Sequence, residues 1–258
     1  MNSLRNVLAI ADKELRSYFA SPIAYIIIGL FALLFGVFFN LYLSVFVQRS
    51  MGMSQFGGGG ATNINQDMIR GVLMNAAVII LFVMPMITMR TYAEEKRSGT
   101  IELLLTSPLT DVQIILGKFL GALALYAAML LVTMLDIAIL FRFGNPEWKP
   151  IAVGYLGLLL LGGCFLSLGL LISSLTKNQI VAGVVTFTVF LTLWIINWSA
   201  DQSGPIGRAV LNHLSIIEHF DDFGRGIIDT KHLVYYLSFI TFGLFLTAKS
   251  VDSERWRG

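Results

Sequence analysis

The chain has few charged residues and a single cysteine, and both scarcities narrow its class. Charged residues occupy 13% of its 258 positions and hydrophobic residues 56%, whereas roughly a quarter of the residues in a soluble domain are charged. With Cys164 alone, neither an intramolecular disulfide nor a thiolate metal cluster can form. A formal net charge of +2 is too small to indicate a nucleic-acid partner. The composition therefore predicts an integral membrane protein whose main partner is the lipid bilayer.

Motifs of nucleotide hydrolysis and of common catalytic sites are also missing. The only Gly-Lys pair is Gly117-Lys118, which Phe119 follows, and Val112 stands where a P-loop has its first glycine. Neither His-Glu-x-x-His nor Gly-x-Ser-x-Gly occurs. We therefore expect no catalytic residue and no cofactor bound by this chain, which is not predicted to be an enzyme.

One outer segment combines histidine with aspartate, the residues from which metal sites are built. It contains His213, His219, Asp221 and Asp222. A metal site there is the less favoured interpretation, because polar residues at a membrane surface need no ligand to explain them. We therefore predict no metal-binding residue.

Six apolar blocks are long enough to cross roughly 30 Å of hydrocarbon as helices. Strands are excluded because, in lipid, an isolated strand leaves its backbone amides unpaired. The sequence thus predicts an all-α integral membrane protein, in which residues 1–258 form one transmembrane domain. The predicted spans are residues 23–47, 72–89, 114–140, 151–172, 180–198 and 233–248.

The distribution of lysine and arginine predicts the orientation. The termini and the connections on their side of the membrane contain eleven of the 18 basic residues, and the connections on the other side contain the rest. Because the side richer in Lys and Arg faces the cytoplasm, both termini are predicted to be cytoplasmic.

Two segments outside the spans have the apolar spacing of amphipathic helices. Residues 1–22 predict an interfacial helix on the inner membrane surface, which Ser21-Pro22 ends before the first span. Residues 201–231 predict an amphipathic helix on the outer surface, which Gly224 and Gly226 end.

The densest charge cluster, residues 90–108, connects the second and third spans. Arg90 and Glu94 are four residues apart, so the second span can continue as a helix with a one-turn ion pair. Gly99 is a natural stop for that helix. Thr100 can then cap a second, short helix, which Ser107-Pro108 ends.

The third span is predicted to begin at Thr110, which forms a capping box with Gln113. A rigid helix, a short exposed helix and a second rigid helix suit a segment that transmits force from a cytoplasmic partner to two spans. The alternative is a solvated hairpin that only joins the spans. Three consecutive leucines, residues 103–105, favour a partner, because they are costly in water unless lipid or protein covers them.

The order and spacing of four motifs resemble the membrane subunits of type 2 ABC exporters. The resemblance is closest to the permeases associated with bacterial gliding motility and with nitrous-oxide-reductase maturation, and it covers essentially the whole chain. The motifs are Lys13-Glu14-Leu15 with Ser21-Pro22, the cluster from Glu94 to Pro108, the run from Ser173 to Gln179, and the run from His219-Phe220 to Asp229.

In that family the segment between spans two and three is a coupling helix, which docks into a separate ATPase subunit. The resemblance therefore implies a primary contact and a second, smaller one with an ABC-type ATPase. The residues implied are Glu94, Glu95, Lys96, Arg97, Gly99, Thr100, Ile101, Glu102, Leu103 and Leu104, with Ser174, Thr176 and Lys177 in the second contact.

The resemblance also implies the surroundings of the chain. It places the chain in the bacterial cytoplasmic (inner) membrane, with ATP and magnesium held by the partner ATPase. An exporter needs more spans than one chain supplies, so a homodimer or a pair with a homologous second permease is implied. The gliding-type systems add an auxiliary membrane protein with a periplasmic domain.

Two spans carry further candidate residues. Pro85 predicts a kink in the second span and is a candidate hinge, although a purely structural kink explains it as well. Candidates to line a path lie in the fifth span, where interhelical hydrogen bonding is the alternative role. They are Thr186, Thr188, Thr192 and Asn197.

The leading hypothesis is the permease half of an ATP-driven exporter. The alternative is a non-transporting component that passes ATPase-driven motion to a periplasmic or cell-surface partner through residues 57–60 and 201–231. A third hypothesis, an ATP-independent secondary transporter, requires ionisable residues at mid-membrane. Only Asp136 and Lys118 approach that position, and both are predicted to be peripheral.

Overall fold

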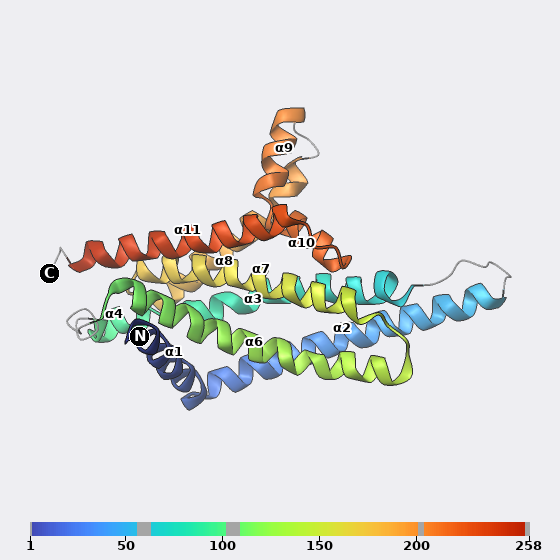
Figure 1. The fold of residues 1–258 in the computed structure, drawn as a ribbon, viewed down its shortest axis with the longest axis horizontal. Coiled ribbons are helices and arrows are strands. Elements are labelled where there is room, and N and C mark those ends of the chain that lie inside the picture. The colour runs from blue at the N-terminus through green and yellow to red at the C-terminus, as the bar shows by residue number, and fades with distance from the viewer. Residues whose placement is uncertain (1, 56–62, 102–108, 201–203, 256–258) are drawn as a thin grey trace.

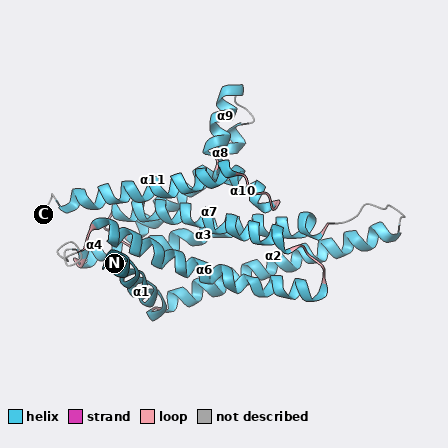
Figure 2. Cartoon of the chain, in the orientation of Figure 1, coloured by secondary structure: helices cyan, strands magenta, loops and turns pink. Residues whose placement is uncertain are grey.

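The computed structural model describes residues 2–55, 63–101, 109–200 and 204–255, which are helical with short connections (Figures 1 and 2). Within these ranges no strand occurs, and six helices are long and apolar enough to cross a membrane. The predicted all-α membrane class is confirmed.

Each predicted span falls on one long helix. The helices are α2 (Pro22–Gln55), α3 (Arg70–Thr88), α6 (Asp111–Phe143), α7 (Trp148–Ser174), α8 (Gln179–Ala200) and α11 (Thr230–Arg255). A short π-helix, η1 (Asn65–Ile69), leads into α3. With 34 residues, α2 is about 50 Å long at 1.5 Å per residue, longer than the hydrocarbon layer. Its far end protrudes from the bundle in Figure 1.

The core of the bundle lies around α3 and α7, the two most buried of the six long helices. Glycines on α7 allow close approach of its neighbours, as small residues do between membrane helices. A Cβ atom at Gly157 would lie 2.5 Å from the Cβ atom of Phe223, and one at Gly154 would meet the Leu73 side chain of α3. Helix α8 is the least buried of the six.

The N-terminal helix α1 (Asn2–Ala20) ends before Ser21, and α2 begins at Pro22, as predicted. One face of α1 packs on α6. There, a Cβ atom at Gly117 would lie 2.5 Å from the Cβ atom of Ile10, so the two helices are in close backbone contact. Leu4 on the opposite face is 75% exposed. Helix α1 is therefore docked to the bundle on one side and has an apolar surface for lipid on the other.

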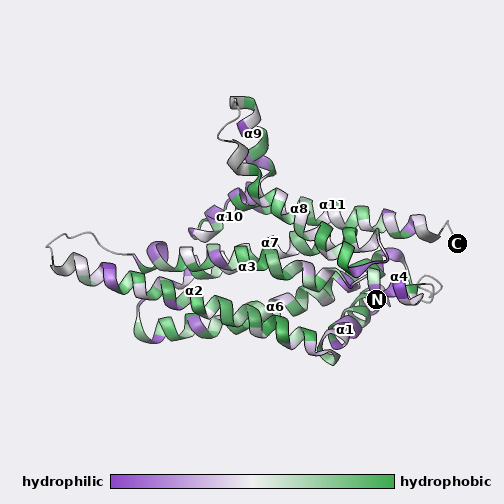
Figure 3. Ribbon diagram, turned by 180° about the vertical axis from the view of Figure 1, so that it is seen from behind, coloured by the Kyte–Doolittle hydropathy of each residue, from purple (hydrophilic) through white to green (hydrophobic). Residues whose placement is uncertain are grey.

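Polar groups gather at particular places along the bundle. The start of α1, the end of α11 and the short helix α4 (Ala93–Ser98) lie at one end of it, and the end of α2 and the start of α3 lie at the other (Figure 1). In Figure 3 the long helices are mainly hydrophobic, and hydrophilic residues concentrate near α4 and α10. An even number of spans explains why the two termini meet at one end.

The amphipathic segment before the last span forms two helices, α9 (Pro205–Leu214) and α10 (Ile216–Gly224), rather than one. Ser215 separates them, and its hydroxyl caps α10 by accepting from the Glu218 amide at 3.4 Å. Helix α9 projects from the bundle (Figure 1), whereas α10 packs on α7 with Phe220 fully buried. The predicted end at Gly224 is confirmed, and Gly226 is left-handed with φ 82°.

Candidate docking site at the α4 end of the bundle

The second span does not continue into α4 as one unbroken helix, contrary to the prediction. Helix α3 ends at Thr88, a turn covers residues 89–92, and α4 begins at Ala93. The cause is Ser173 of α7, whose hydroxyl oxygen accepts from the amides of Tyr92 and Ala93, each at 3.1 Å. That hydroxyl also donates to the Met89 carbonyl at 3.1 Å. A side chain from another helix therefore caps the start of α4, a role normally filled by the residue that precedes the helix.

The local features predicted for this segment are confirmed where the structure describes it. Arg90 Nε lies 3.1 Å from Glu94 Oε2, and Gly99 ends α4 in the left-handed conformation with φ 74°. Thr110 and Gln113 form the predicted capping box at the start of α6. Residues 102–108, with Glu102, Leu103 and Leu104, lie outside the described residues, so the second short helix stays a prediction.

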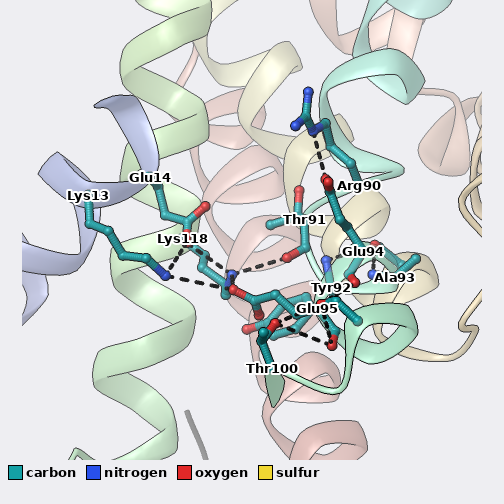
Figure 4. A network of polar contacts seen from close by, with 12 residues as sticks. Lys13, Glu14, Arg90, Thr91, Tyr92, Ala93, Glu94, Glu95, Thr100 and Lys118 are labelled. Atoms are coloured by element: carbon teal, nitrogen blue, oxygen red, sulfur yellow. Dashed lines mark hydrogen bonds and ion pairs between the residues drawn. The ribbon is translucent and has the colours of Figure 1, made fainter. Parts of the chain in front are cut away.

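Lys118 of α6 is the centre of a buried ionic network at this end (Figure 4). Its Nζ atom donates to Glu95 Oε1 at 2.7 Å, to Glu14 Oε1 at 3.1 Å and to the Thr91 carbonyl at 3.1 Å. The ammonium also lies 5.0 Å from the ring centre of Tyr92. Since Glu14 belongs to α1 and Glu95 to α4, one cation joins three helices.

Lys118 is buried even though it lies near one end of the third span: only 1% of its side chain is exposed. An unpaired ammonium in such a place is strongly unfavourable, but two carboxylates and a carbonyl supply acceptors for all three of its N–H groups. Gly117 beside it admits α1 to close contact, which brings Glu14 within reach. A lysine inside an apolar block is unusual enough to be noticed in the sequence, but the sequence does not indicate which residues it contacts.

Tyr18 makes a second connection between α1 and the end of α3. Its hydroxyl donates to the Ile87 carbonyl at 3.4 Å. Burial raises the pKa of Tyr18 to about 12, so this donor stays protonated at neutral pH.

The second predicted contact segment lies against α4. Lys96 is buried and its ammonium donates to the Ser174 carbonyl, which is 78 residues away in the sequence. The Ser174 hydroxyl in turn lies 2.9 Å from the Ser250 hydroxyl of α11. A cleft of about 620 Å³ is lined by Arg97 of α4, by Thr176, Lys177 and Asn178 of the α7–α8 connection, and by the first two residues of α8. The structure thus brings the two segments together into one polar surface.

The other candidate residues lie elsewhere. Pro85 is buried within α3, three residues before the helix ends, and it has no amide hydrogen to donate within the helix. Thr188 and Thr192 are exposed on α8 and donate to carbonyls one turn earlier, whereas Thr186 is buried. The side chain of Asn197 lies outside the described residues. The hinge and the path lining stay predictions.

Among the described residues, six helices long and apolar enough to cross a membrane carry a polar surface at one end, which defines the class as a multi-pass membrane protein. Residues 52–197 match the model of the ABC-2 family transporter proteins. Because this match covers more than half of the chain, the chain belongs to that family.

Two relatives have descriptions that agree with this assignment. The probable multidrug ABC transporter permease YbhR of Escherichia coli is 31% identical over 153 residues, which cover 58% of this chain and 41% of YbhR. The probable ABC transporter permease protein NosY of Pseudomonas aeruginosa is 30% identical over 145 residues, which cover 52% of this chain and 53% of NosY. The chain therefore spans only about half, or less, of the length of these relatives.

The family and the six spans define the chain as the multi-pass permease component of an ABC-2 type transporter. The similar proteins are described as probable ABC transporter permeases. The hypothesis of an ATP-independent secondary transporter is not supported by this family.

Proposed function

We propose that this chain is the permease subunit of an ATP-driven exporter in the bacterial cytoplasmic membrane. Residues 1–258 form its transmembrane domain, with both termini and α4 in the cytoplasm. The orientation is supported by the excess of Lys and Arg on the side of the termini and by the position of α4 at the same end of the bundle (Figure 1).

The ABC ATPase docks on the surface formed by α4 and the α7–α8 connection, which we call the α4 surface. The observation that carries this proposal is the convergence of the two segments on one cleft. Glu94, Arg97 and Lys177 are exposed there, so their charges are available to a partner. The ATPase binds ATP and magnesium, and the permease changes conformation together with it.

Force on α4 reaches the bundle by two routes. Glu95 transmits it through Lys118 to α6 and to Glu14 of α1. Ser173 transmits it to α7, because its hydroxyl holds the first amides of α4. Buried polar contacts of this kind resist separation, since each partner left alone is a costly unpaired group. Helix α4 therefore moves together with α1, α6 and α7 rather than as a loose loop.

A second permease, identical or homologous, completes the transporter. Helix α8 leaves Val181, Val184 and Val185 exposed in the part of the chain that the structure describes. Lipid or the second permease covers this surface, and the path for substrate lies between the two permeases.

The ATPase contact is tested by charge reversal on the α4 surface. Arg97→Glu and Lys177→Glu are each expected to reduce copurification with the cognate ATPase, because both place a negative charge where the partner meets a positive one. Arg16→Glu is the matched control: it makes the same change at an exposed residue of α1, outside the cleft. Copurification that survives the double variant Arg97→Glu/Lys177→Glu would refute the assignment.

The second candidate function is a non-transporting component that acts on a periplasmic or cell-surface partner, as in gliding-type systems with an auxiliary periplasmic-domain protein. It is supported by α9, which projects from the bundle and leaves Ile206, Val210 and Leu214 exposed. ATP-dependent flux in proteoliposomes separates the two candidates. The description of YbhR as a multidrug permease makes a fluorescent amphiphilic drug the first substrate to test. Flux of the drug supports the exporter; ATPase activity that responds to the permease with no flux of any tested substrate supports the second candidate.

A further inference from the structure

All three histidines of the chain meet at the junction of α9, α10 and α11. The Nδ1 atoms of His219 and His232 are 2.6 Å apart, and the rings of His213 and His219 are 5.6 Å apart between centres. His219 and His232 are both buried. Besides the contacts among the histidines, the His219 ring stacks on Tyr235 at 3.8 Å between ring centres.

The hydrogen bonds of this cluster determine which ring nitrogens carry protons. His219 Nε2 lies 3.1 Å from the His213 carbonyl, which accepts only, so this nitrogen is the donor. In the neutral ring, Nδ1 of His219 then has a lone pair and accepts from Nδ1–H of His232. Nε2 of His232 is consequently left with a lone pair.

That lone pair points at a carboxylate. His232 Nε2 lies 2.7 Å from Asp222 Oδ2, and both atoms are acceptors. A cation must join them: a proton fits directly between two atoms this close, whereas a metal ion would replace the proton and bind beside both atoms. Asp229 supplies a third donor, since the ligand atoms of Asp222, Asp229 and His232 all lie within 4.8 Å of one another.

We propose that Asp222, Asp229 and His232 bind a divalent transition-metal ion such as Zn²⁺. One imidazole nitrogen and two carboxylate oxygens are ligands that Zn²⁺ accepts, with a further position open. The imidazole favours such an ion over Mg²⁺ or Ca²⁺, which prefer oxygen ligands alone. His219 is a positioning residue, because it holds the second ring N–H of His232 as the outer partners of metal-bound histidines do.

The ion pairs around the site indicate which carboxylates are available as metal ligands. Asp221, although next to Asp222, is held by Arg70 and by Arg225, each at 2.5 Å. Lys231 pairs with Asp229 at 3.2 Å, but the lysine side chain is 63% exposed, and an exposed pair of this kind contributes little. A divalent ion therefore displaces Lys231 more easily than either arginine.

The donor set differs from the one considered from sequence alone. The His213 ring is not a ligand, because it packs edge-on against Tyr235. The backbone carbonyl of His213 accepts a hydrogen bond from His219 Nε2. His232 and Asp229, from the start of α11 and the turn before it, replace His213 and Asp221. A recess of about 460 Å³ reaches Asp222 and His232, so an ion has access from the surface.

Zinc titration of the purified full-length chain tests the site. The protein is purified without a polyhistidine tag. A chromophoric zinc chelator competes with it for the ion and reports how much zinc the protein binds. The wild type is expected to take one tightly held Zn²⁺ per chain. His232→Ala and Asp222→Asn are expected to abolish that binding, and His219→Gln to weaken it roughly ten- to a hundredfold. His213→Ala is the matched control and is expected to bind as the wild type does.

Folding and coordination are measured on the same samples. Asp229→Asn changes a half-buried carboxylate that is 40% exposed, and it is expected to fold normally while it loses zinc. This variant covers the case in which His232→Ala fails to fold. X-ray absorption at the zinc edge is expected to show one nitrogen and otherwise oxygen ligands. Zinc binding by His232→Ala, loss of binding by His213→Ala, or a wild type that binds no more zinc than Asp222→Asn would each overturn the proposal.

Discussion

Lys118 Nζ lies 2.7 Å from Glu95 Oε1 and joins the third span to the helix that we assign to ATPase contact. Glu14 of α1 shares the same ammonium at 3.1 Å. Lys118 is buried, and the longer contacts of the exposed Lys13 with the same carboxylates, at 3.7 and 3.9 Å, replace it only in part, so its removal is costly. This relationship makes α1, α4 and α6 one mechanical unit.

The first prediction concerns the lysine of this unit. Lys118→Met removes the cation and leaves two carboxylates close together, so the free energy of unfolding is expected to fall by about 3–5 kcal/mol. Thermal unfolding in detergent measures the change. Lys149→Met replaces an exposed lysine and is expected to have little effect. The triple variant Lys118→Met/Glu14→Gln/Glu95→Gln should recover part of the loss, and a triple variant no more stable than Lys118→Met would contradict this explanation.

The second prediction concerns the cap that α7 provides for α4. Ser173→Ala leaves the amides of Tyr92 and Ala93 buried without their acceptor, which costs about 1–2 kcal/mol for a lost helix cap. Hydrogen exchange of α4 amides is therefore expected to accelerate, and stimulation of the partner ATPase to weaken. Ser98→Ala alters an exposed hydroxyl at the other end of α4 and is the control. Equal exchange rates in the two variants would show that Ser173 does not hold this helix.

The third prediction concerns the contact between α1 and α6. Gly117→Val places methyl groups where Ile10 now lies, and overpacking of this kind costs about 1–3 kcal/mol. We expect α1 to separate from the bundle and trypsin to cut faster after Lys13 and Arg16. Gly29→Val is the control, since nothing lies within 4 Å of a Cβ atom at that position. Unchanged proteolysis of α1 in Gly117→Val would mean that the helix is held by other contacts.

The fourth prediction concerns orientation. Cys164 is buried, so Cys164→Ser provides a background for single cysteines at exposed positions. Asn63→Cys, at the end of the bundle far from α4, is expected to react with a membrane-impermeant maleimide added to intact cells. Ser253→Cys, near the end of α11, is expected to react only after permeabilisation. Labelling in the reverse order would invert the topology and move the α4 surface out of the cytoplasm.

Several features were predictable because they depend on neighbouring residues. The minimum length of a span follows from the thickness of the bilayer, and Pro22 and Gly99 end helices through their own backbone preferences. The side chains of Thr110 and Gln113 each accept a hydrogen bond from the other residue's backbone amide, so four consecutive residues determine where α6 begins. These interactions have the same geometry in any fold that contains the segment.

Other features were missed because their partners are distant in sequence. Ser173 interrupts the helix between Thr88 and Ala93 from 80 residues away, and no local pattern signals it. Ser215 divides the segment before the last span because α10 turns to bury Phe220 against α7, whereas α9 packs on α8. Burial against a particular neighbour, and not periodicity, decided both boundaries.

The sequence by itself determined the membrane class, the six spans and the charged segment between the second and third spans, because hydropathy and helix capping act over short distances. Only the tertiary structure decided that Lys118 is buried between Glu14 and Glu95, that the α7–α8 connection lies against α4, and that His232 faces Asp222. These contacts depend on how helices pack side by side, which fixes the distances between residues that the sequence keeps far apart.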